Sequence, residues 1–240
     1  MQLYHKIKTL FERDKTTFVV NPGRIKAPVL RTIREWDVTE KIDGTNIRVM
    51  FSKAGGVSIG GRSNAAQIPG DLVQYLFNTF RENQLRTALW LNGPVDVVLY
   101  GEGYGPGIQK GDLYRPDKAF ILFDVLVGGQ WWLDREAVDD VAHKLGIATV
   151  PYLGRMTLDQ IADLVRTPFP SKLGTAMAEG IVGRPIETLF DKHHDRIIIK
   201  LKTKDFVGGK GNDKKLRHNF SPGAARREPG SVNRGSYPCR

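Results

Sequence analysis

Glu40-Lys41-Ile42-Asp43-Gly44-Thr45-Asn46 is the most informative stretch of this sequence, because it sets a lysine between two carboxylates just before an apolar run. A lysine amine becomes a nucleophile only where its proton leaves readily, which requires desolvation or neighbouring positive charge. Lys200 and Lys202, in a second apolar run far downstream, can supply that charge. Lys-x-Asp-Gly alone is a weak pattern that an exposed lysine at the start of an edge strand also fits, so further motifs must decide its meaning.

The spacing of apolar residues predicts an α+β domain with mainly antiparallel strands and no regular strand–helix alternation. β-branched runs bounded by turn residues predict strands at residues 36–40, 45–52, 56–59, 95–100, 119–127, 178–182 and 196–201. Helical spacing predicts helices over residues 71–90, 135–145 and 158–165. Asp71, Asp134 and Thr157 are the expected N-caps of these helices.

Several short motifs follow the Lys41 stretch in order, as far as residue 202. They are Gly61-Arg62-Ser63, Tyr100-Gly101-Glu102, Phe120-Ile121-Leu122-Phe123-Asp124-Val125, Glu179-Gly180-Ile181-Val182 and Lys200-Leu201-Lys202. The ordered set resembles the motifs of the covalent nucleotidyltransferases, the superfamily of polynucleotide ligases and RNA capping enzymes. Within that superfamily, the Lys41 stretch and residues 200–206 are most similar to ATP-dependent RNA ligases of the RNA ligase 2 type.

The resemblance implies a nucleotidyltransferase (adenylyltransferase) domain, in which two mainly antiparallel sheets flanked by helices hold the nucleotide in the cleft between them. It also implies an ATP-dependent RNA ligase with ATP and Mg²⁺ or Mn²⁺ as cofactors. In that reaction the lysine takes AMP from ATP, and AMP passes to the 5′-phosphate of a nucleic acid. A 3′-hydroxyl then displaces AMP and seals the break.

The same resemblance assigns the site residues. Lys41, Lys200 and Lys202 are the expected catalytic residues, and Glu179 is the expected metal ligand. The expected nucleotide-binding residues are Glu40, Lys41, Ile42, Asn46, Arg62, Glu102, Phe123, Glu179, Lys200 and Lys202.

General chemistry agrees with several of these roles. Lys200, Lys202 and a divalent cation are expected to lower the pKa of Lys41 and to stabilise charge on the phosphate oxygens. Arg62 offers a planar fork for phosphate or ribose oxygens, and Glu102 is expected at a strand end, where it can accept ribose hydroxyls. Phe123 is expected to stack on adenine, and its alternative is ordinary core packing.

Composition adds a domain division. The 240 residues carry a net charge of +10, and residues 208–240 hold eight Lys or Arg against two acidic residues with almost no aliphatic side chains. We therefore expect a nucleotidyltransferase domain over residues 1–207 and a basic, disordered tail over residues 208–240. No apolar run approaches the roughly 20 residues that cross a bilayer, and Cys239 is the only cysteine. These features suggest a monomer of the reducing cytoplasm without a membrane partner.

The resemblance leaves alternatives open. Only 34 residues follow Phe206, too few for the oligonucleotide-binding barrel of DNA ligases and capping enzymes or for the helical domain of related RNA ligases. Either the basic tail substitutes for that domain, or an accessory protein does. An ATP-dependent DNA ligase and a nucleotide- or nucleic-acid-binding protein with degenerate ligase activity remain alternatives. The expected partner is RNA, as a nicked duplex or an RNA/DNA hybrid. The glycine-rich residues 101–107 lack phosphate-loop spacing and are expected to form a flexible loop at the edge of the site.

Overall fold

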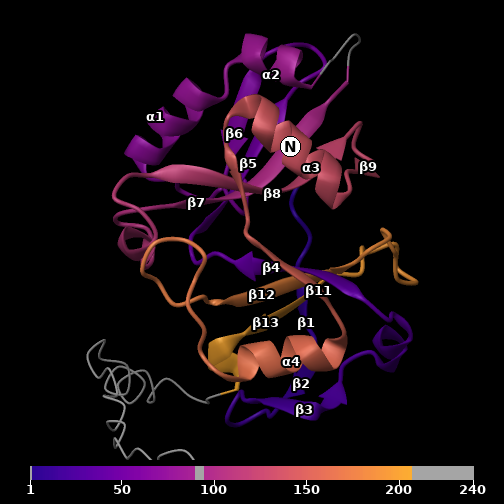
Figure 1. Ribbon diagram of the computed structural model, residues 1–240. Coiled ribbons are helices and arrows are strands. Elements are labelled where there is room, and N and C mark those ends of the chain that lie inside the picture. Colours follow the sequence, from indigo (N-terminus) through magenta and orange to yellow (C-terminus); the bar gives the residue numbers. More distant parts are fainter. Residues whose placement is uncertain (1, 90–94, 207–240) are drawn as a thin grey trace, which may run out of the picture.

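The computed structural model describes residues 2–89 and 95–206, and it arranges them in two halves, each built around a sheet (Figure 1). The sheet of the upper half has the order β10-β8-β7-β5-β6, with β9 paired to β8. Its strands are β5 (Thr45–Phe51), β6 (Val57–Gly60), β7 (Val97–Tyr104), β8 (Ala119–Val127), β9 (Trp131–Trp132) and β10 (Ala148–Thr149). Only the pairing of β10 with β8 is parallel in this sheet.

The sheet of the lower half has the order β1-β13-β12-β4-β11. Its strands are β1 (Lys8–Thr9), β4 (Trp36–Lys41), β11 (Tyr152–Met156), β12 (Gly180–Pro185) and β13 (Ile199–Lys202). Below it lies a hairpin of β2 (Phe11–Arg13) and β3 (Val20–Ile25) (Figure 1). Two sheets of mainly antiparallel strands confirm the α+β prediction.

Within the described part of the chain, four helices cover the outer faces of the sheets. The upper sheet carries α1 (Gly70–Thr79), α2 (Glu82–Ala88) and α3 (Arg135–Leu145), and the lower sheet carries α4 (Leu158–Arg166) (Figure 1). Short 3-10 turns occur at Pro28–Thr32, Gly111–Leu113 and Thr203–Asp205. Among the described residues, no helix combines the length and the apolar character that a bilayer crossing needs.

The ends of two helices follow the predicted capping residues. The side chain of Asp134 accepts a hydrogen bond from the amide of Ala137, and Gly146 ends α3 in the left-handed conformation with φ of 65°. Thr157 forms a capping box with Gln160 at the start of α4.

The predicted single helix over residues 71–90 is wrong. The chain breaks at Phe80 and Arg81, which separate α1 from α2, and residue 90 lies outside the described residues. Asp71 is not the N-cap, because α1 already begins at Gly70; its carboxylate binds Lys118 instead. The break allows Phe80 to turn into the core, where it meets Phe120 edge-on at 5.2 Å between ring centroids.

Each half has its own apolar core. In the upper half, Leu72, Leu76 and Val138 from the helices pack against Leu99 and the neighbouring strands. In the lower half, Trp36, Val38, Ile161, Ile181 and Leu201 form the centre of the second core. A fully buried side chain of this kind contributes about 1.5–3 kcal/mol. Because the two cores are separate, the inner faces of the two sheets are left to form a cleft.

The segment between β4 and β5 connects the two halves. Ile42, Asp43 and Gly44 leave the lower sheet and enter the upper one. A side chain at Gly44 would collide with the backbone of Gly103 and with Glu102, so only glycine fits this crossing. Lys41 therefore lies where the two sheets meet.

Candidate active site

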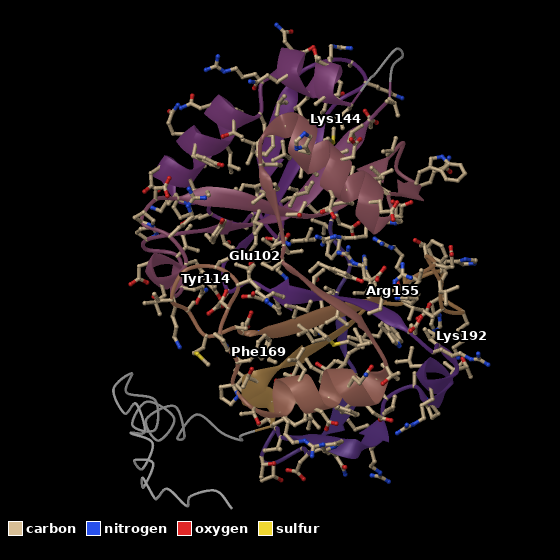
Figure 2. The ribbon with its side chains drawn as sticks, in the orientation of Figure 1. Glu102, Tyr114, Lys144, Arg155, Phe169 and Lys192 are labelled. Atoms are coloured by element: carbon tan, nitrogen blue, oxygen red, sulfur yellow. The ribbon has the colours of Figure 1, made fainter. Side chains whose placement is uncertain are left out.

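A cleft of about 390 Å³ lies between the two sheets. This volume falls within the range of small-molecule sites in proteins. Figure 2 shows Glu102 and Tyr114 at the level where the two halves meet. All the nucleotide-binding and catalytic residues predicted from the sequence line this cleft: Glu40, Lys41, Ile42, Asn46, Arg62, Glu102, Phe123, Glu179, Lys200 and Lys202.

Three neighbouring strands bring the charged residues of the lower wall together. Gly180 lies opposite Lys41 in the β4–β12 pairing and opposite Lys202 in the β12–β13 pairing. Glu179 directly precedes β12 and lies outside it, although the predicted strand over residues 178–182 included this residue. The ammonium of Lys41 lies 2.5 Å from one carboxylate oxygen of Glu179, and the ammonium of Lys202 binds the other. One carboxylate therefore links the two lysines.

The expected lowering of the pKa of Lys41 is wrong for this structure. Burial of the amine acts to lower its pKa, but the carboxylates of Glu179 and Glu102 outweigh burial, and the pKa lies above its ordinary value. Lys200 behaves in the opposite way. Its burial, followed by the charges of Lys202 and Lys41, lowers the pKa of Lys200. Lys41 is therefore held as an ammonium ion by Glu179.

Glu102 and Asn46 lie side by side on the upper wall of the cleft. They are partners in the β5–β7 pairing, so Glu102 lies inside β7 and not at its end as predicted. Burial raises the pKa of Glu102 to about 7, although Lys41 opposes this effect. The side-chain oxygen of Asn46 is buried and has no hydrogen-bond partner among the residues that the structure places. Such a buried acceptor can receive a hydrogen bond from a ligand.

Glu40 is fixed by a loop that the sequence did not single out. Its carboxylate accepts hydrogen bonds from the hydroxyl of Ser171 at 2.5 Å and from the amide of Lys172 at 2.9 Å. The side chain of Ile42 packs in an apolar cluster with Tyr104 and neighbouring residues, so only its backbone can reach a nucleotide. These contacts depend on the loop before β12, which no local pattern around Glu40 indicates.

Phe123 and Arg62 lie at the edge of the cleft. Phe123 is half-buried and contacts Tyr4 edge-on, with 5.1 Å between the ring centroids. Phe123 therefore packs against Tyr4 and also lines the cleft, so the structure is compatible with core packing and leaves part of the residue at the cleft wall. Arg62 is exposed just after β6, close enough to Lys200 to add to the positive charge that acts on it.

The structure adds wall residues that the sequence interpretation missed. Tyr4 and His5 approach from the N-terminal segment, and the hydroxyl of Tyr4 donates a hydrogen bond to the buried carboxylate of Asp124 at 2.7 Å. The predicted edge loop over residues 101–107 is wrong in its first part, because residues 101–104 belong to β7. Gln109, just beyond that stretch, also lines the cleft and has φ of 52°. The Gly-Pro-Gly sequence just before Gln109 was the one available signal, since it marks a tight turn at a fixed place.

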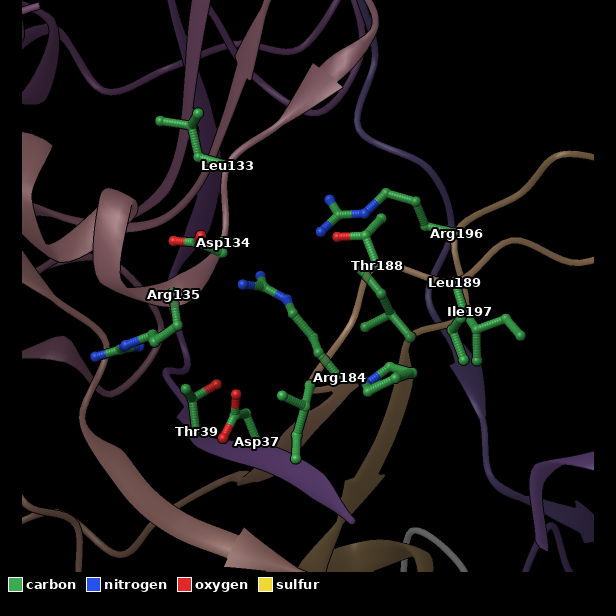
Figure 3. Close-up of a pocket in the computed structure, with 13 residues that line it drawn as sticks. Asp37, Thr39, Leu133, Asp134, Arg135, Arg184, Thr188, Leu189, Arg196 and Ile197 are labelled. Atoms are coloured by element: carbon green, nitrogen blue, oxygen red, sulfur yellow. The ribbon is translucent and has the colours of Figure 1, made fainter. Parts of the chain in front are cut away.

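A second, smaller pocket shares Thr39 and Arg184 with the cleft (Figure 3). Its volume of about 30 Å³ suits one or two water molecules. Its arginines are already paired: Arg196 and Arg184 bind Asp124 at 2.7 and 3.4 Å, and Arg135 binds Asp139 at 2.9 Å. This pocket therefore offers neither space nor free charge for a nucleotide.

The cleft can hold a divalent cation only if the nucleotide supplies some of the ligands of that cation. Within the described ranges, no group of three or more His, Cys, Asp or Glu residues is arranged to hold a metal. Glu179 and Asp43 both line the cleft, and burial, followed by the charge of Glu179, raises the pKa of Asp43. Mg²⁺ commonly binds one or two carboxylates together with substrate phosphates and water, so one carboxylate suffices for such a site.

Known structures share this architecture. A point variant of Naegleria gruberi RNA ligase with ATP and Mn matches at 18% identity with a TM-score of 0.56, covering 84% of this chain and 60% of that chain. The Naegleria gruberi RNA ligase with PPi matches at 18% identity with a TM-score of 0.55, covering 84% and 62%. This chain thus spans about 60% of the length of the first of these proteins. At this identity the likeness shows the fold alone. A family model described as RNA ligase matches residues 34–202, which is more than half of the sequence, and the chain belongs to the RNA ligase family.

Proposed function

We propose that this protein is an ATP-dependent RNA ligase that joins 3′-hydroxyl and 5′-phosphate ends through a lysyl-AMP intermediate. The observation that carries the proposal is the cluster of Lys41 on β4, Glu179 directly before β12 and Lys202 on β13, with Lys200 beside it, in a cleft of nucleotide size. A degenerate binding protein would have no need to keep an amine, a carboxylate and two further amines together at this point.

In the first step the amine of Lys41 attacks the α-phosphate of ATP. A nitrogen–phosphorus bond forms, the bond to the bridging oxygen breaks, and pyrophosphate leaves. The ammonium must first lose its proton, and Glu179, 2.5 Å away, is the nearest group that can take it. Lys200 and Lys202 are placed to stabilise negative charge on the phosphate oxygens as the leaving group departs.

The remaining cleft residues bind the nucleotide in this proposal. Glu102 and the unpartnered oxygen of Asn46 accept hydrogen bonds from hydroxyl or amino groups, and Phe123 offers a ring to the base. Arg62 binds phosphate or ribose oxygens. A divalent cation at Glu179 would neutralise charge on the phosphates.

Related structures support the choice of cofactors. Structures of the Naegleria gruberi RNA ligase contain ATP and Mn, AMP and Mn, or PPi. We infer ATP with Mg²⁺ or Mn²⁺ for this chain. As part of the same proposal, the protein acts as a monomer in the cytoplasm, on nicked RNA duplexes or RNA/DNA hybrids in RNA repair. Residues 208–240, which lie outside the described residues, or an accessory protein supply the further nucleic-acid contacts.

Transfer of label from α-labelled ATP tests this function. We expect a covalent AMP adduct on Lys41 in the wild type and none in Lys41→Ala. Lys53→Ala is the matched control, because Lys53 is an exposed lysine in the turn between β5 and β6. Sealing is then measured on nicked RNA and nicked DNA duplexes. An adduct on another residue, or a wild type that takes no label, would contradict the nucleotidyltransferase assignment, and sealing of DNA alone would favour the DNA ligase alternative.

A further inference from the structure

A groove of about 750 Å³, nearly twice the volume of the cleft, adjoins the cleft on its Lys200 and Lys202 side. The groove and the cleft share five residues: His5, Lys6, Ile7, Lys200 and Lys202. The groove continues beyond them along residues from three segments that are far apart in the sequence: Lys8, Thr9, Arg13, Lys26, Asp195, Lys204 and Asp205. The site of the proposed chemistry therefore opens directly into this groove.

The groove carries a surplus of positive charge. Seven of its lining residues are Lys or Arg and two are Asp. Both acidic residues are already engaged: the buried carboxylate of Asp205 binds Arg13 at 2.7 Å, and Asp195 lies 3.8 Å from Lys8. Lys8 also binds Asp191 at 3.1 Å and Lys202 binds Glu179, so the uncompensated positive charge of the groove comes from Lys6, Lys26, Lys200 and Lys204, none of which has an acidic side chain within 4.0 Å among the described residues.

Lys26 and Lys204 show the surplus most clearly. Both are exposed, and within residues 2–89 and 95–206 neither has an acidic side chain within 4.0 Å. Lys26 follows β3, and Lys204 lies in the 3-10 turn after β13. The fold therefore brings two lysines that are far apart in the sequence to one groove. Like charges gathered on one concave surface repel each other and attract a polyanion.

We propose that this groove binds the sugar–phosphate backbone of a single RNA strand and leads the end of that strand to the cleft. The inference rests on the proposed ligase function and adds the path of the substrate to it. A volume of about 750 Å³ lies in the range of small-ligand sites and so accommodates a few nucleotides of one strand, such as the strand that carries the end to be joined at a nick. Lysines suit this role because they contact phosphates without reading the base sequence.

Salt-dependent binding tests the inference. The probe is a fluorescent, 5′-phosphorylated, single-stranded RNA 12-mer, and the protein is the full chain. The groove variant is Lys26→Ala/Lys204→Ala, and the control is Lys53→Ala/Arg81→Ala, which removes two exposed charges from the other half. Each phosphate contact on a single strand contributes about 0.7 to the slope of log affinity against log salt. We expect the slope to decrease by about 1.4 in the groove variant, with a loss of about 25-fold in affinity at 0.1 M salt, and no change in the control.

Labelling by α-labelled ATP separates this inference from the proposed function. The groove variant should take up AMP at the wild-type rate, because neither Lys26 nor Lys204 lines the cleft. Equal salt slopes for the groove variant and the control would overturn the inference. Reduced AMP labelling with an unchanged RNA slope would also overturn it, and would make the groove a polyphosphate site. A wild type without AMP labelling would refute the ligase proposal, whereas the RNA slopes would still decide the groove.

Discussion

Gly180 offers a direct test of how the lower sheet positions the site. It lies between Lys41 and Lys202 in the sheet, with φ of 155°, a conformation that L-residues rarely adopt. A Cβ atom at this position would lie 2.6 Å from the Cα atom of Lys202 and still closer to the carbonyl oxygen of Leu201. Both obstacles are backbone atoms, so Gly180→Ala must move β13 away from β12.

The expected cost has two parts. Forcing an extra methyl group into a packed site typically costs about 1–3 kcal/mol. A backbone conformation that alanine avoids adds about 1–3 kcal/mol. The free energy of unfolding should therefore fall by roughly 2–6 kcal/mol, which a domain of ordinary stability can lose and remain folded at low temperature. Because Lys202 moves with β13, and misplacement by about 1 Å can cost 10²-fold, AMP labelling should slow by about that factor.

Gly129→Ala is the matched control. Gly129 has φ of 75°, but no atom lies within 4 Å of the added methyl group, so this variant carries the conformational cost without the collision. Urea unfolding gives both free energies, and single-turnover labelling with α-labelled ATP gives both rates. We expect Gly129→Ala to lose about 1–3 kcal/mol and to label at the wild-type rate.

Two results would refute this reasoning. Equal losses of stability in Gly180→Ala and Gly129→Ala would mean that β13 has room to accept the methyl group. A wild-type labelling rate in folded Gly180→Ala would mean that the position of Lys202 beside Glu179 does not matter for AMP transfer.

Three further predictions concern side chains of the cleft. Lys200→Ala and Lys202→Ala should each slow AMP labelling by about 10²-fold or more, since each removes a fixed cation near the phosphates; wild-type rates would make them ordinary strand residues. Phe123→Ala should raise the KM for ATP more than it lowers kcat, as steady-state kinetics can show, and the opposite pattern would argue against contact with the base. Glu102 has a folded-state pKa of about 7, above its ordinary value of 4.5, so its contribution to stability is complete below pH 4.5 and is lost as the pH rises through 7. The stability of the wild type relative to Glu102→Gln should therefore fall by up to about 3 kcal/mol between pH 5 and pH 8 in urea unfolding, and a constant difference would contradict the raised pKa.

Local sequence patterns predicted the elements that depend on local physics. The strand over residues 119–127 was predicted with its observed bounds, because nine mainly apolar residues between turn signals suit a strand buried on both faces. The ends of α3 were predicted from Asp134 and Gly146, which satisfy helix termini through their own side chain or conformation. The break between α1 and α2 was not predicted, because it depends on the contact of Phe80 with Phe120 across the core.

The sequence indicated ten of the residues that line the cleft but not their contacts. The order of the motifs predicted that Glu40, Lys200 and the other motif residues lie together, and they line one cleft. The reason is that strand order and pairing fix where each motif lies. The hydrogen bond from Ser171 to Glu40 and the position of Tyr4 join residues more than 100 positions apart. Such pairings follow from the tertiary fold, and one sequence without its structure contains no local signal for them.

The direction of the pKa shift of Lys41 shows why the contacts of a cleft residue, and not only its presence in the cleft, matter for the mechanism. From the sequence, Lys200 and Lys202 were counted as free cations near Lys41, and free cations lower the pKa of an amine. In the structure, Glu179 lies between the two lysines, and one of its carboxylate oxygens binds Lys41 while the other binds Lys202. The negative charge of Glu179 therefore largely compensates the effect of Lys202 on Lys41. Lys41 is therefore an ammonium ion in an ion pair with Glu179. If Lys41 takes AMP from ATP as proposed, its ion pair with Glu179 must first be broken. In the proposed mechanism, Glu179 thus helps to set the protonation state of Lys41, through a pairing that the order of the motifs did not indicate.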